Sequence, residues 1–327
     1  QIEEWDVVTG LKKRTFSSAP AIKPYSHRLS AFKNEWLLIG NLLWHFKNDI
    51  RVIKVDSLLT NSVITPDGKY IITVDSWQFK ILDINTLKIL QTGKIPLGPY
   101  PKIASVSTDN KHILIDNSVI DIQKPKLEYY VKYPTSEVAM SPNGRYLASN
   151  PKNFDTVEFR IFDLEQRKII YKANIRGSNL SFSDDSRYLF FHANQSINIY
   201  DIVTGALRQF AIGDTQVANS INLFDNKIYF LGYSDTGLTT WSIPEYKITI
   251  LDFESGMLIK NLDANYGATE AHFIDPEKIL VFSEYSCRLI DYKTGNEIIT
   301  LYGFENGEWA VFADKYWDAS AGVGNYF

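Results

Sequence analysis

The 327-residue chain has a single cysteine, Cys287. One thiol can form neither an intramolecular disulfide nor a cysteine-based metal site. Cys287 lies in a strand-like stretch, where a half-buried structural role is favoured over that of a reactive nucleophile. Low cysteine content suits both the cytoplasm and the periplasm, so the sequence leaves the compartment open.

Long apolar runs and an excess of one charge are also missing. The most apolar stretch, residues 36–44, is far shorter than the roughly 20 residues of a membrane-spanning helix. The net charge is −4 and charged residues make up 22% of the chain, so neither a disordered chain nor a basic nucleic-acid surface is expected. No segment combines helical periodicity with capping residues. The lack of helical segments favours an all-β fold.

What the sequence does contain is a repeat, in which an apolar stretch ends in Asp and a short turn leads to a second apolar stretch. A Thr-Gly or Ser-Gly pair often supplies the positive-φ residue of a tight hairpin, and the Asp can accept hydrogen bonds from N–H groups of the turn. The spacings between successive aspartates are 38, 42, 38, 51 and 39 residues. These anchor aspartates are Asp83, Asp121, Asp163, Asp201, Asp252 and Asp291.

A second hairpin precedes several of the anchored ones. Residues 62–72 and 139–148 place Asp-Gly or Asn-Gly between two apolar runs, and residues 180–189 repeat the pattern without glycine. Two hairpins in tandem make a four-stranded antiparallel sheet, and a period near 40 residues is typical of a β-propeller. We therefore predict that residues 1–327 form a single β-propeller domain.

The number of blades follows from the same spacing. Asp6 and Asp83 are 77 residues apart, almost two periods, so a degenerate blade is expected at residues 35–53. This gives seven complete blades. Pairing the terminal segments, residues 1–16 and 303–327, as one split blade closes the ring with eight blades and removes exposed edges. The alternative is seven blades with the termini packed elsewhere.

At this point the chain resembles WD40-like propellers. The strand-Asp-x-x-Thr-Gly unit, after the Ser-Pro-Asn-Gly-Arg-Tyr-Leu-Ala stretch of residues 141–148, is close to many bacterial WD40 repeats. The family's Gly-His dipeptide is absent, and Trp-Asp occurs at a strand end only as Trp5-Asp6. Residues 306–320 are similar to a segment that follows the propeller in some large bacterial WD40-repeat proteins. The resemblance implies a bacterial propeller from a larger multidomain protein.

Sequence motifs for catalysis are missing. No two of the five histidines, His27, His45, His112, His192 and His272, lie within five residues of each other, so no local zinc motif exists. Residues 232–237 narrowly miss the Gly-x-Ser-x-Gly nucleophile elbow, because Thr236 replaces the second glycine. We therefore assign no catalytic, cofactor-binding or metal-binding residue and expect that the protein is not an enzyme.

Two insertions point instead to an interaction face. The 51-residue spacing has its surplus in residues 232–246, and a smaller excess falls in residues 150–155. In a WD40-like arrangement both lie between the second and third strands of a blade, on the same face as the links between blades. Aromatic and arginine side chains are common interface anchors. The candidates on this face are Trp77, Tyr100, Phe154, Arg176, Tyr233, Trp241 and Tyr285.

We therefore predict a non-catalytic propeller that serves as an interaction platform for a protein or peptide, with no nucleic-acid partner and no cofactor. The alternative is a propeller enzyme, or a small-molecule- or metal-binding propeller, with its site at the central channel as in lactonase-like or quinoprotein-like families. That alternative requires carboxylate, His or Arg side chains from several blades to converge on the axis, and the sequence shows no repeated axial position of this kind.

Overall fold

The computed structural model describes most of the chain as β-strands and the turns between them. The described residues are 2–5, 12–16, 30–33, 36–39, 42–45, 51–54, 62–75, 78–94, 103–123, 126–130, 135–151, 158–175, 177–212, 216–234, 245–264, 267–283, 286–303, 308–313 and 316–319. Within these ranges every regular element is a strand, and neighbouring strands pair antiparallel. The predicted all-β class is confirmed.

Six of the sheets in these ranges have four strands each, joined in chain order. They are β3–β6 (Ser30–Lys33, Trp36–Ile39, Leu42–His45, Arg51–Lys54), β7–β10 (Ser62–Ile64, Tyr70–Asp75, Gln78–Asp83, Ile89–Lys94), β11–β14 (Ile103–Val106, His112–Ile115, Ser118–Asp121, Lys126–Tyr130), β15–β18 (Thr135–Met140, Tyr146–Pro151, Phe159–Asp163, Lys168–Ala173), β19–β22 (Ser178–Phe182, Tyr188–Ala193, Ser196–Asp201, Leu207–Ala211) and β23–β26 (Gln216–Phe224, Lys227–Ser234, Glu245–Asp252, Leu258–Asp263).

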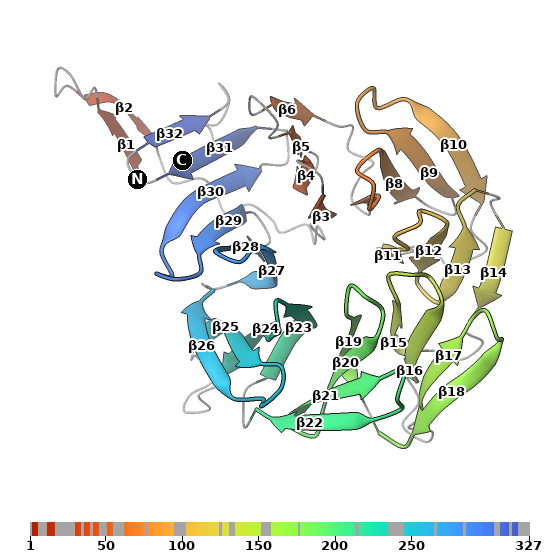
Figure 1. The fold of residues 1–327 in the computed structure, drawn as a ribbon. Coiled ribbons are helices and arrows are strands. Elements are labelled where there is room, and N and C mark those ends of the chain that lie inside the picture. The colour runs from red at the N-terminus through yellow and green to blue at the C-terminus, as the bar shows by residue number, and fades with distance from the viewer. Residues whose placement is uncertain are drawn as a thin grey trace.

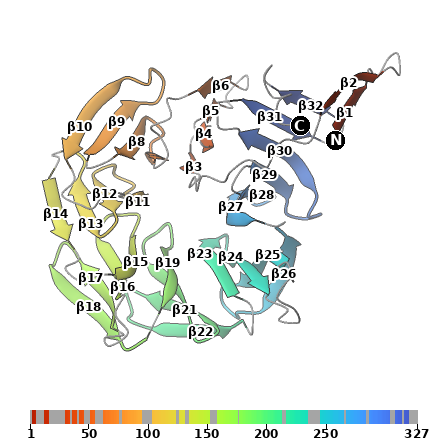
Figure 2. The same cartoon turned by 180° about the vertical axis from the view of Figure 1, so that it is seen from behind.

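Two further sheets complete the described fold. A six-stranded sheet contains β27–β32 (Ala268–Asp275, Lys278–Ser283, Ser286–Asp291, Glu297–Gly303, Trp309–Ala313, Tyr316–Ala319), and a two-stranded hairpin contains β1 and β2 (Ile2–Trp5, Lys12–Phe16). The four-stranded sheets and the six-stranded sheet are arranged around a common centre (Figure 1). Figure 2 shows the same ring from behind. The first strand of each sheet lies nearest the centre and the later strands lie toward the outer wall (Figure 1).

The predicted blade count is wrong. Both eight four-stranded blades and the alternative seven are excluded, because the described residues form six four-stranded blades. The expected split blade does not form. Instead, β31 and β32 continue outward from β30 in the six-stranded sheet, while β1 and β2 hydrogen-bond only to each other among the described strands. The predicted degenerate blade at residues 35–53 is present as strands β4, β5 and β6, with β3 as its innermost strand.

The anchor aspartates form the turns that the sequence predicts. The Asp83 Oδ1 atom accepts hydrogen bonds from the backbone N–H groups of Asn85, at 3.1 Å, and Thr86, at 2.8 Å. These N–H groups lack strand partners, so the carboxylate satisfies donors that the turn leaves open. Equivalent carboxylate-to-turn hydrogen bonds occur at Asp121, Asp163, Asp201, Asp252 and Asp291.

The inner hairpins use a different polar turn. Ser141 Oγ donates to Asn143 Oδ1 over 2.7 Å, and the backbone N–H of Tyr146 donates to Ser141 Oγ over 2.8 Å. Gly144 completes this turn with a φ of +72°, and a Cβ there would lie 2.7 Å from the His112 Nδ1 atom of the preceding blade. The close blade contact therefore requires glycine at this position, and the positive φ favours it. The same hydroxyl-to-Asx contact recurs at Thr65, Ser107 and Ser183.

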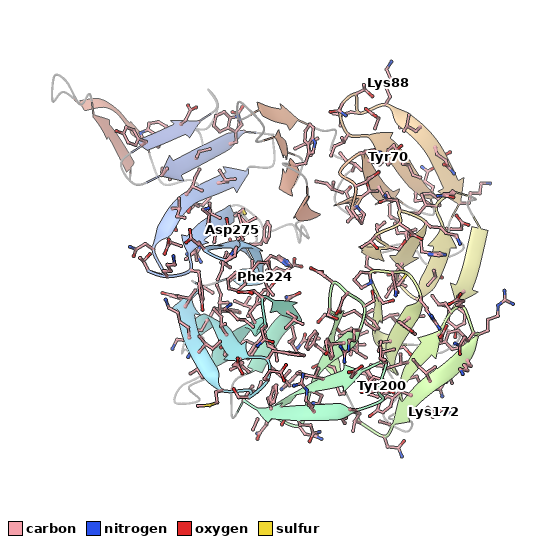
Figure 3. The ribbon with its side chains drawn as sticks, in the orientation of Figure 1. Tyr70, Lys88, Lys172, Tyr200, Phe224 and Asp275 are labelled. Carbon is pink, nitrogen blue, oxygen red and sulfur yellow. The ribbon has the colours of Figure 1, made fainter. Side chains whose placement is uncertain are left out.

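The apolar core lies between neighbouring sheets. Phe190 and Ile199 of blade β19–β22 pack with Phe230 and Leu251 of blade β23–β26 in one buried cluster. Similar clusters join five further pairs of neighbouring sheets, from β3–β6 with β7–β10 round to β23–β26 with the six-stranded sheet, and side chains lie between these sheets (Figure 3). Because each blade contributes one face to each neighbour, the ring holds its loops on a packed scaffold.

Candidate interaction surfaces

The ring presents two faces, each lined by a different set of connections. We call the loop face the one that carries the loops between second and third strands and the links between blades; the turn face carries the two hairpin turns of each blade. Of the seven predicted interaction residues, only Tyr233 belongs to the described part of the chain. The other six, Trp77, Tyr100, Phe154, Arg176, Trp241 and Tyr285, lie outside the described residues.

Tyr233 lies at the loop face, near the end of β24. It is directly opposite Tyr246 of β25, and the two ring centroids are 5.7 Å apart with the planes tilted by 37°. Both side chains are half-buried. The aromatic pair therefore stands at the base of the predicted insertion, whose residues 235–244 lie outside the described ranges.

Polar contacts between blades hold the inner part of the loop face together. The Glu137 carboxylate of β15 accepts hydrogen bonds from the backbone N–H groups of Asn179, at 2.7 Å, and Leu180, at 2.6 Å, on the inner strand of the next blade. Nearby, the buried Asn150 side chain donates to the Gly177 carbonyl. These hydrogen bonds satisfy backbone groups that an inner strand edge would leave open.

A charged cluster lies beside the second predicted insertion. The Glu158 carboxylate accepts a hydrogen bond from Arg160 Nε at 2.7 Å and forms an ion pair with Lys172 Nζ at 2.9 Å. Hydrogen bonds from Lys172 and Arg160 hold the pKa of Glu158 below its ordinary value. The Glu158 carboxylate therefore holds two cationic side chains together at this part of the loop face.

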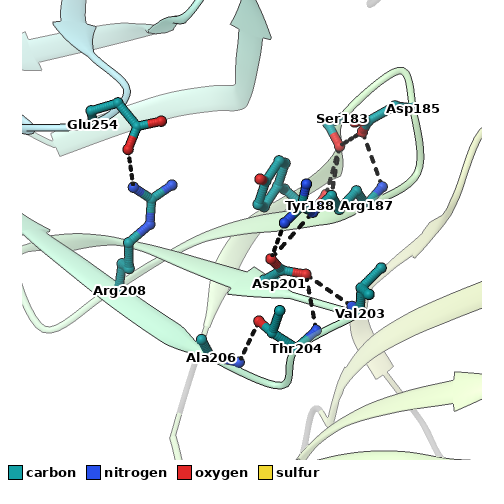
Figure 4. Close-up of polar contacts among 10 residues, drawn as sticks. All are labelled: Ser183, Asp185, Arg187, Tyr188, Asp201, Val203, Thr204, Ala206, Arg208 and Glu254. Carbon is teal, nitrogen blue, oxygen red and sulfur yellow. Dashed lines mark hydrogen bonds and ion pairs between the residues drawn. The ribbon is translucent and has the colours of Figure 1, made fainter.

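On the turn face, two neighbouring blades carry matching Arg–Asp pairs. Arg187 Nη2 lies 2.9 Å from Asp201 Oδ2, while Asp201 Oδ1 accepts the N–H groups of Val203 and Thr204 (Figure 4). The preceding blade repeats this pair as Arg145 and Asp163, also at 2.9 Å. Because these carboxylates and guanidinium groups already have partners within their own blade, they are poorly placed to recognise an external ligand.

The comparisons with known proteins agree with this architecture. No known family model matches the sequence, and no curated protein matches it significantly. BamB from Moraxella catarrhalis matches with a TM-score of 0.55 at 10% identity, over 92% of this chain and 98% of that one. The β-propeller domain of Cps50 (Swd1) from Myceliophteria thermophila matches with 0.53 at 13% identity, over 86% and 97%.

A third solved structure is an enzyme, the hydrazine synthase of Kuenenia stuttgartiensis, with a TM-score of 0.55, 15% identity and coverage of 73% and 78%. At these identities the matches concern the fold alone. The chain folds as a β-propeller. Within the part of the propeller that the structure describes, no helix has the length and apolar character needed to cross a membrane.

The described histidines and Cys287, which are possible catalytic or metal-binding residues, lie on separate strands of the propeller. His112 begins β12 and His192 lies in β20, where burial lowers its pKa, while His272 of β27 contacts Glu270 at 3.3 Å. Cys287 is buried in β29, and burial raises the pKa of its thiol. Among the described residues, no group of three or more His, Cys, Asp or Glu side chains is arranged to hold a metal ion.

The near-miss nucleophile motif also has a defined place. Gly232 and Ser234 belong to strand β24, where they pair with Lys247 and Glu245 of β25. A nucleophile elbow requires a sharp turn from a strand into a helix. Ser234 instead lies in a regular antiparallel ladder, at the end of its strand.

The outer wall of the propeller carries exposed apolar side chains that the sequence analysis did not predict. Where the fourth strands begin, several large aliphatic side chains are exposed to solvent. Their position in the sequence could have indicated this exposure. These residues follow the turn that leads into an outermost strand, and such a strand can be covered on one side only. They are Ile89, Leu90, Ile169, Leu207, Met257, Leu258, Ile259 and Ile298.

Proposed function

We propose that this propeller is a non-catalytic platform that binds a protein or peptide partner on its loop face. The Tyr233–Tyr246 pair carries the proposal, because it sets two aromatic rings at the base of the longest insertion, on strands packed into a blade. Aromatic side chains on a rigid support are typical interface anchors, since they bury much area at low entropic cost. The polar groups of the turn face, in contrast, are largely satisfied within the blades.

The sequence resemblance supports a wider role within the same proposal. We place the propeller in a larger bacterial multidomain protein, in which it supplies the recognition surface. Propellers suit this use because many loops project from one scaffold and can vary without disturbing the core.

The test uses the complete chain as bait for a partner identified by cross-linking, followed by affinity measurements on variants. We expect Trp241→Ala and Phe154→Ala to weaken partner binding at least tenfold, the loss of about 1.4 kcal/mol, while thermal unfolding stays unchanged. Val203→Ser is the matched control, since Val203 is exposed on the turn face. Unchanged binding in the first two variants, with a partner demonstrably held, would refute the face assignment.

One observation favours the alternative of a ligand site at the ring centre. Glu270 and His272 lie on the innermost strand β27 of the six-stranded sheet and contact each other at 3.3 Å. A carboxylate beside an imidazole is a common acid–base pair. If this pair served a ligand, Glu270→Gln would abolish ligand binding or turnover and leave partner binding on the loop face intact.

A further inference from the structure

Two blades carry the same combination of exposed aliphatic and cationic side chains where the fourth strand begins. The first corner consists of Lys88, Ile89 and Leu90 before and within β10. The second corner consists of Arg167, Lys168 and Ile169 before and within β18. All six side chains are exposed, and Ile89 and Leu90 expose 55% and 58% of their surface.

The two corners occupy equivalent places in their blades. The Lys88 carbonyl accepts the N–H of the anchor Asp83 at 3.0 Å, and Lys168 pairs in register with the anchor Asp163. In three other sheets the residue whose carbonyl accepts the anchor N–H is uncharged, namely Ala206, Met257 and Asn296. The lysines at this place therefore mark one part of the outer wall.

A β-bulge interrupts the outer strand at both corners. The pairing of β10 with β9 shifts between Ile89 and Gln91, which leaves Leu90 as the extra residue. The pairing of β18 with β17 shifts in the same way between Ile169 and Tyr171. Bulges disturb the edge and protect it against the addition of another strand, so a partner would meet side chains here rather than a free backbone ladder.

The charge of the two corners is positive, and no carboxylate among the described residues pairs with it. Among the described residues, no carboxylate lies within salt-bridge distance of Lys88, Arg167 or Lys168. The carboxylates of the same two turns have other partners. Asp83 accepts hydrogen bonds from its own turn, while Arg145 pairs with both Asp163, at 2.9 Å, and Glu165, at 3.2 Å.

We propose that the two corners bind an acidic, amphipathic segment of a partner protein. Its carboxylates would pair with the free cations, and its apolar side chains would cover the exposed aliphatic residues. The shape of the wall favours a flexible polypeptide over a membrane, because β10 and β18 lie on the convex outside of the ring, where Lys88 and Lys172 also extend (Figures 1 and 3). A flat bilayer meets a convex wall at one blade only, whereas a chain can follow it.

This site is distinct from the loop face, since the corners adjoin the outer turns at the opposite end of the blades. Failure of one proposal therefore leaves the other standing. The probe is a fluorescent synthetic peptide in which pairs of glutamates alternate with leucines, and binding to the complete chain is followed by anisotropy at low salt. Poly-glutamate of equal length tests for charge alone, and vesicles of phosphatidylserine and phosphatidylcholine test for a membrane.

We expect the amphipathic peptide to bind at least tenfold more tightly than poly-glutamate, with an affinity that falls as salt is added. The double variant K88E/K168E and the double variant I89S/L90S should each weaken it about tenfold or more. K69E changes an exposed lysine on an inner turn of the same blade and should leave binding unchanged. No binding, equal binding of poly-glutamate, binding of the vesicles alone, or insensitivity to both double variants would overturn the proposal.

Discussion

Arg208 of one blade clamps onto Phe253 of the next. Its Nη1 atom donates to the Phe253 backbone carbonyl over 3.1 Å, and its guanidinium carbon lies 4.2 Å from the centre of the Phe253 ring. Phe253 directly follows the anchor Asp252, so the outer strand β22 is fixed to the turn that Asp252 organises in the neighbouring blade. This contact joins the two blades at the border of the apolar core, since Phe253 belongs to the buried cluster between them.

Two other blades make the same kind of link. Lys260 Nζ donates to the carbonyl of Tyr292 at 2.9 Å, and Gln91 Nε2 donates to that of Ile122 at 3.3 Å. Each acceptor is the residue after an anchor aspartate. The anchored turn therefore serves its own hairpin and also presents a carbonyl to the outer strand of the preceding blade.

The contact between Arg208 and Phe253 predicts that replacing Arg208 destabilises the fold to a degree that depends on the new side chain. We expect Arg208→Ala to lower the free energy of unfolding by about 1–2 kcal/mol, since a charged hydrogen bond and a cation–π contact are lost from a side chain that is one-third exposed. Arg208→Lys should lose less, because the charge remains but the planar stacking does not. Urea unfolding measures both. Arg167→Ala, at an exposed arginine outside these links, should be close to neutral, and equal losses at the two positions would contradict the clamp.

Gly256 faces a tighter constraint than its counterpart in the preceding blade. Both Gly256 and Gly205 have positive φ, at +70° and +72°, but a Cβ on Gly256 would lie 2.3 Å from the Phe210 ring, whereas the nearest atom to one on Gly205 is 3.8 Å away. Gly256→Ala should therefore cost about 2–4 kcal/mol, and Gly205→Ala only the backbone strain of about 1 kcal/mol. Thermal unfolding of both variants provides the measurement. A similar loss in the two would show that contact with Phe210 is unimportant.

The repeat could be predicted because its signals are local. An anchor aspartate and the turn after it lie within a few residues of each other. Asp83 and its equivalents therefore predict both the hairpin turns and the spacing of the blades. The blade count could not be predicted in this way, because the last hairpin, β31 and β32, looks the same in sequence whether it joins a terminal hairpin or extends β30. Edge pairing depends on distant strands, which local periodicity does not encode.

The exposed aliphatic residues of the outer wall could not be predicted from the sequence for a related reason. Aromatic residues in insertions draw attention, and Tyr233 does stand at the loop face. The exposure of Ile89 and Leu90 depends instead on a bulge in β10 and on that strand being outermost. In sequence these residues resemble the buried Ile71 and Ile72 of a central strand, and only the strand order separates the two.

We expect the buried thiol of Cys287 to react slowly with thiol-specific reagents. Cys287 is 1% exposed, and burial raises the pKa of its thiol, so little reactive thiolate is available in the folded protein. We expect a thiol-specific reagent to label it only as the six-stranded sheet opens, with a rate that rises steeply in denaturant. As a positive control, Tyr316→Cys on a Cys287→Ala background places a thiol at an 80% exposed position and should react at once. Rapid labelling of native Cys287 would contradict the buried assignment.

Acid should unfold the propeller through the anchor aspartates whose pKa is lowered, namely Asp83, Asp163, Asp201, Asp252 and Asp291. Turn hydrogen bonds, first from Thr86 to Asp83 and from Ser255 to Asp252, hold the pKa of these carboxyls below the ordinary value of 3.8. At Asp201 burial opposes ionisation, but the hydrogen bonds from Arg187 and the turn outweigh it and the pKa is again lowered. A carboxyl with a depressed pKa in the folded state stabilises that state above its unfolded pKa, and this stability is lost as the pH falls.

The direction of these shifts fixes the expected pH profile. The anchors' contribution to the free energy of unfolding should be constant from pH 7 to about pH 5 and should decline below about pH 4 as the folded carboxyls are protonated. Asp252→Asn removes one titrating anchor, so its urea-unfolding midpoint should be lower than that of the parent at pH 7 and should fall less steeply in acid. Asp184→Asn, which alters an exposed turn aspartate outside the anchor position, should leave the parent slope unchanged. Because the anchors recur from blade to blade, a profile identical in parent and Asp252→Asn would place the acid sensitivity elsewhere in the ring.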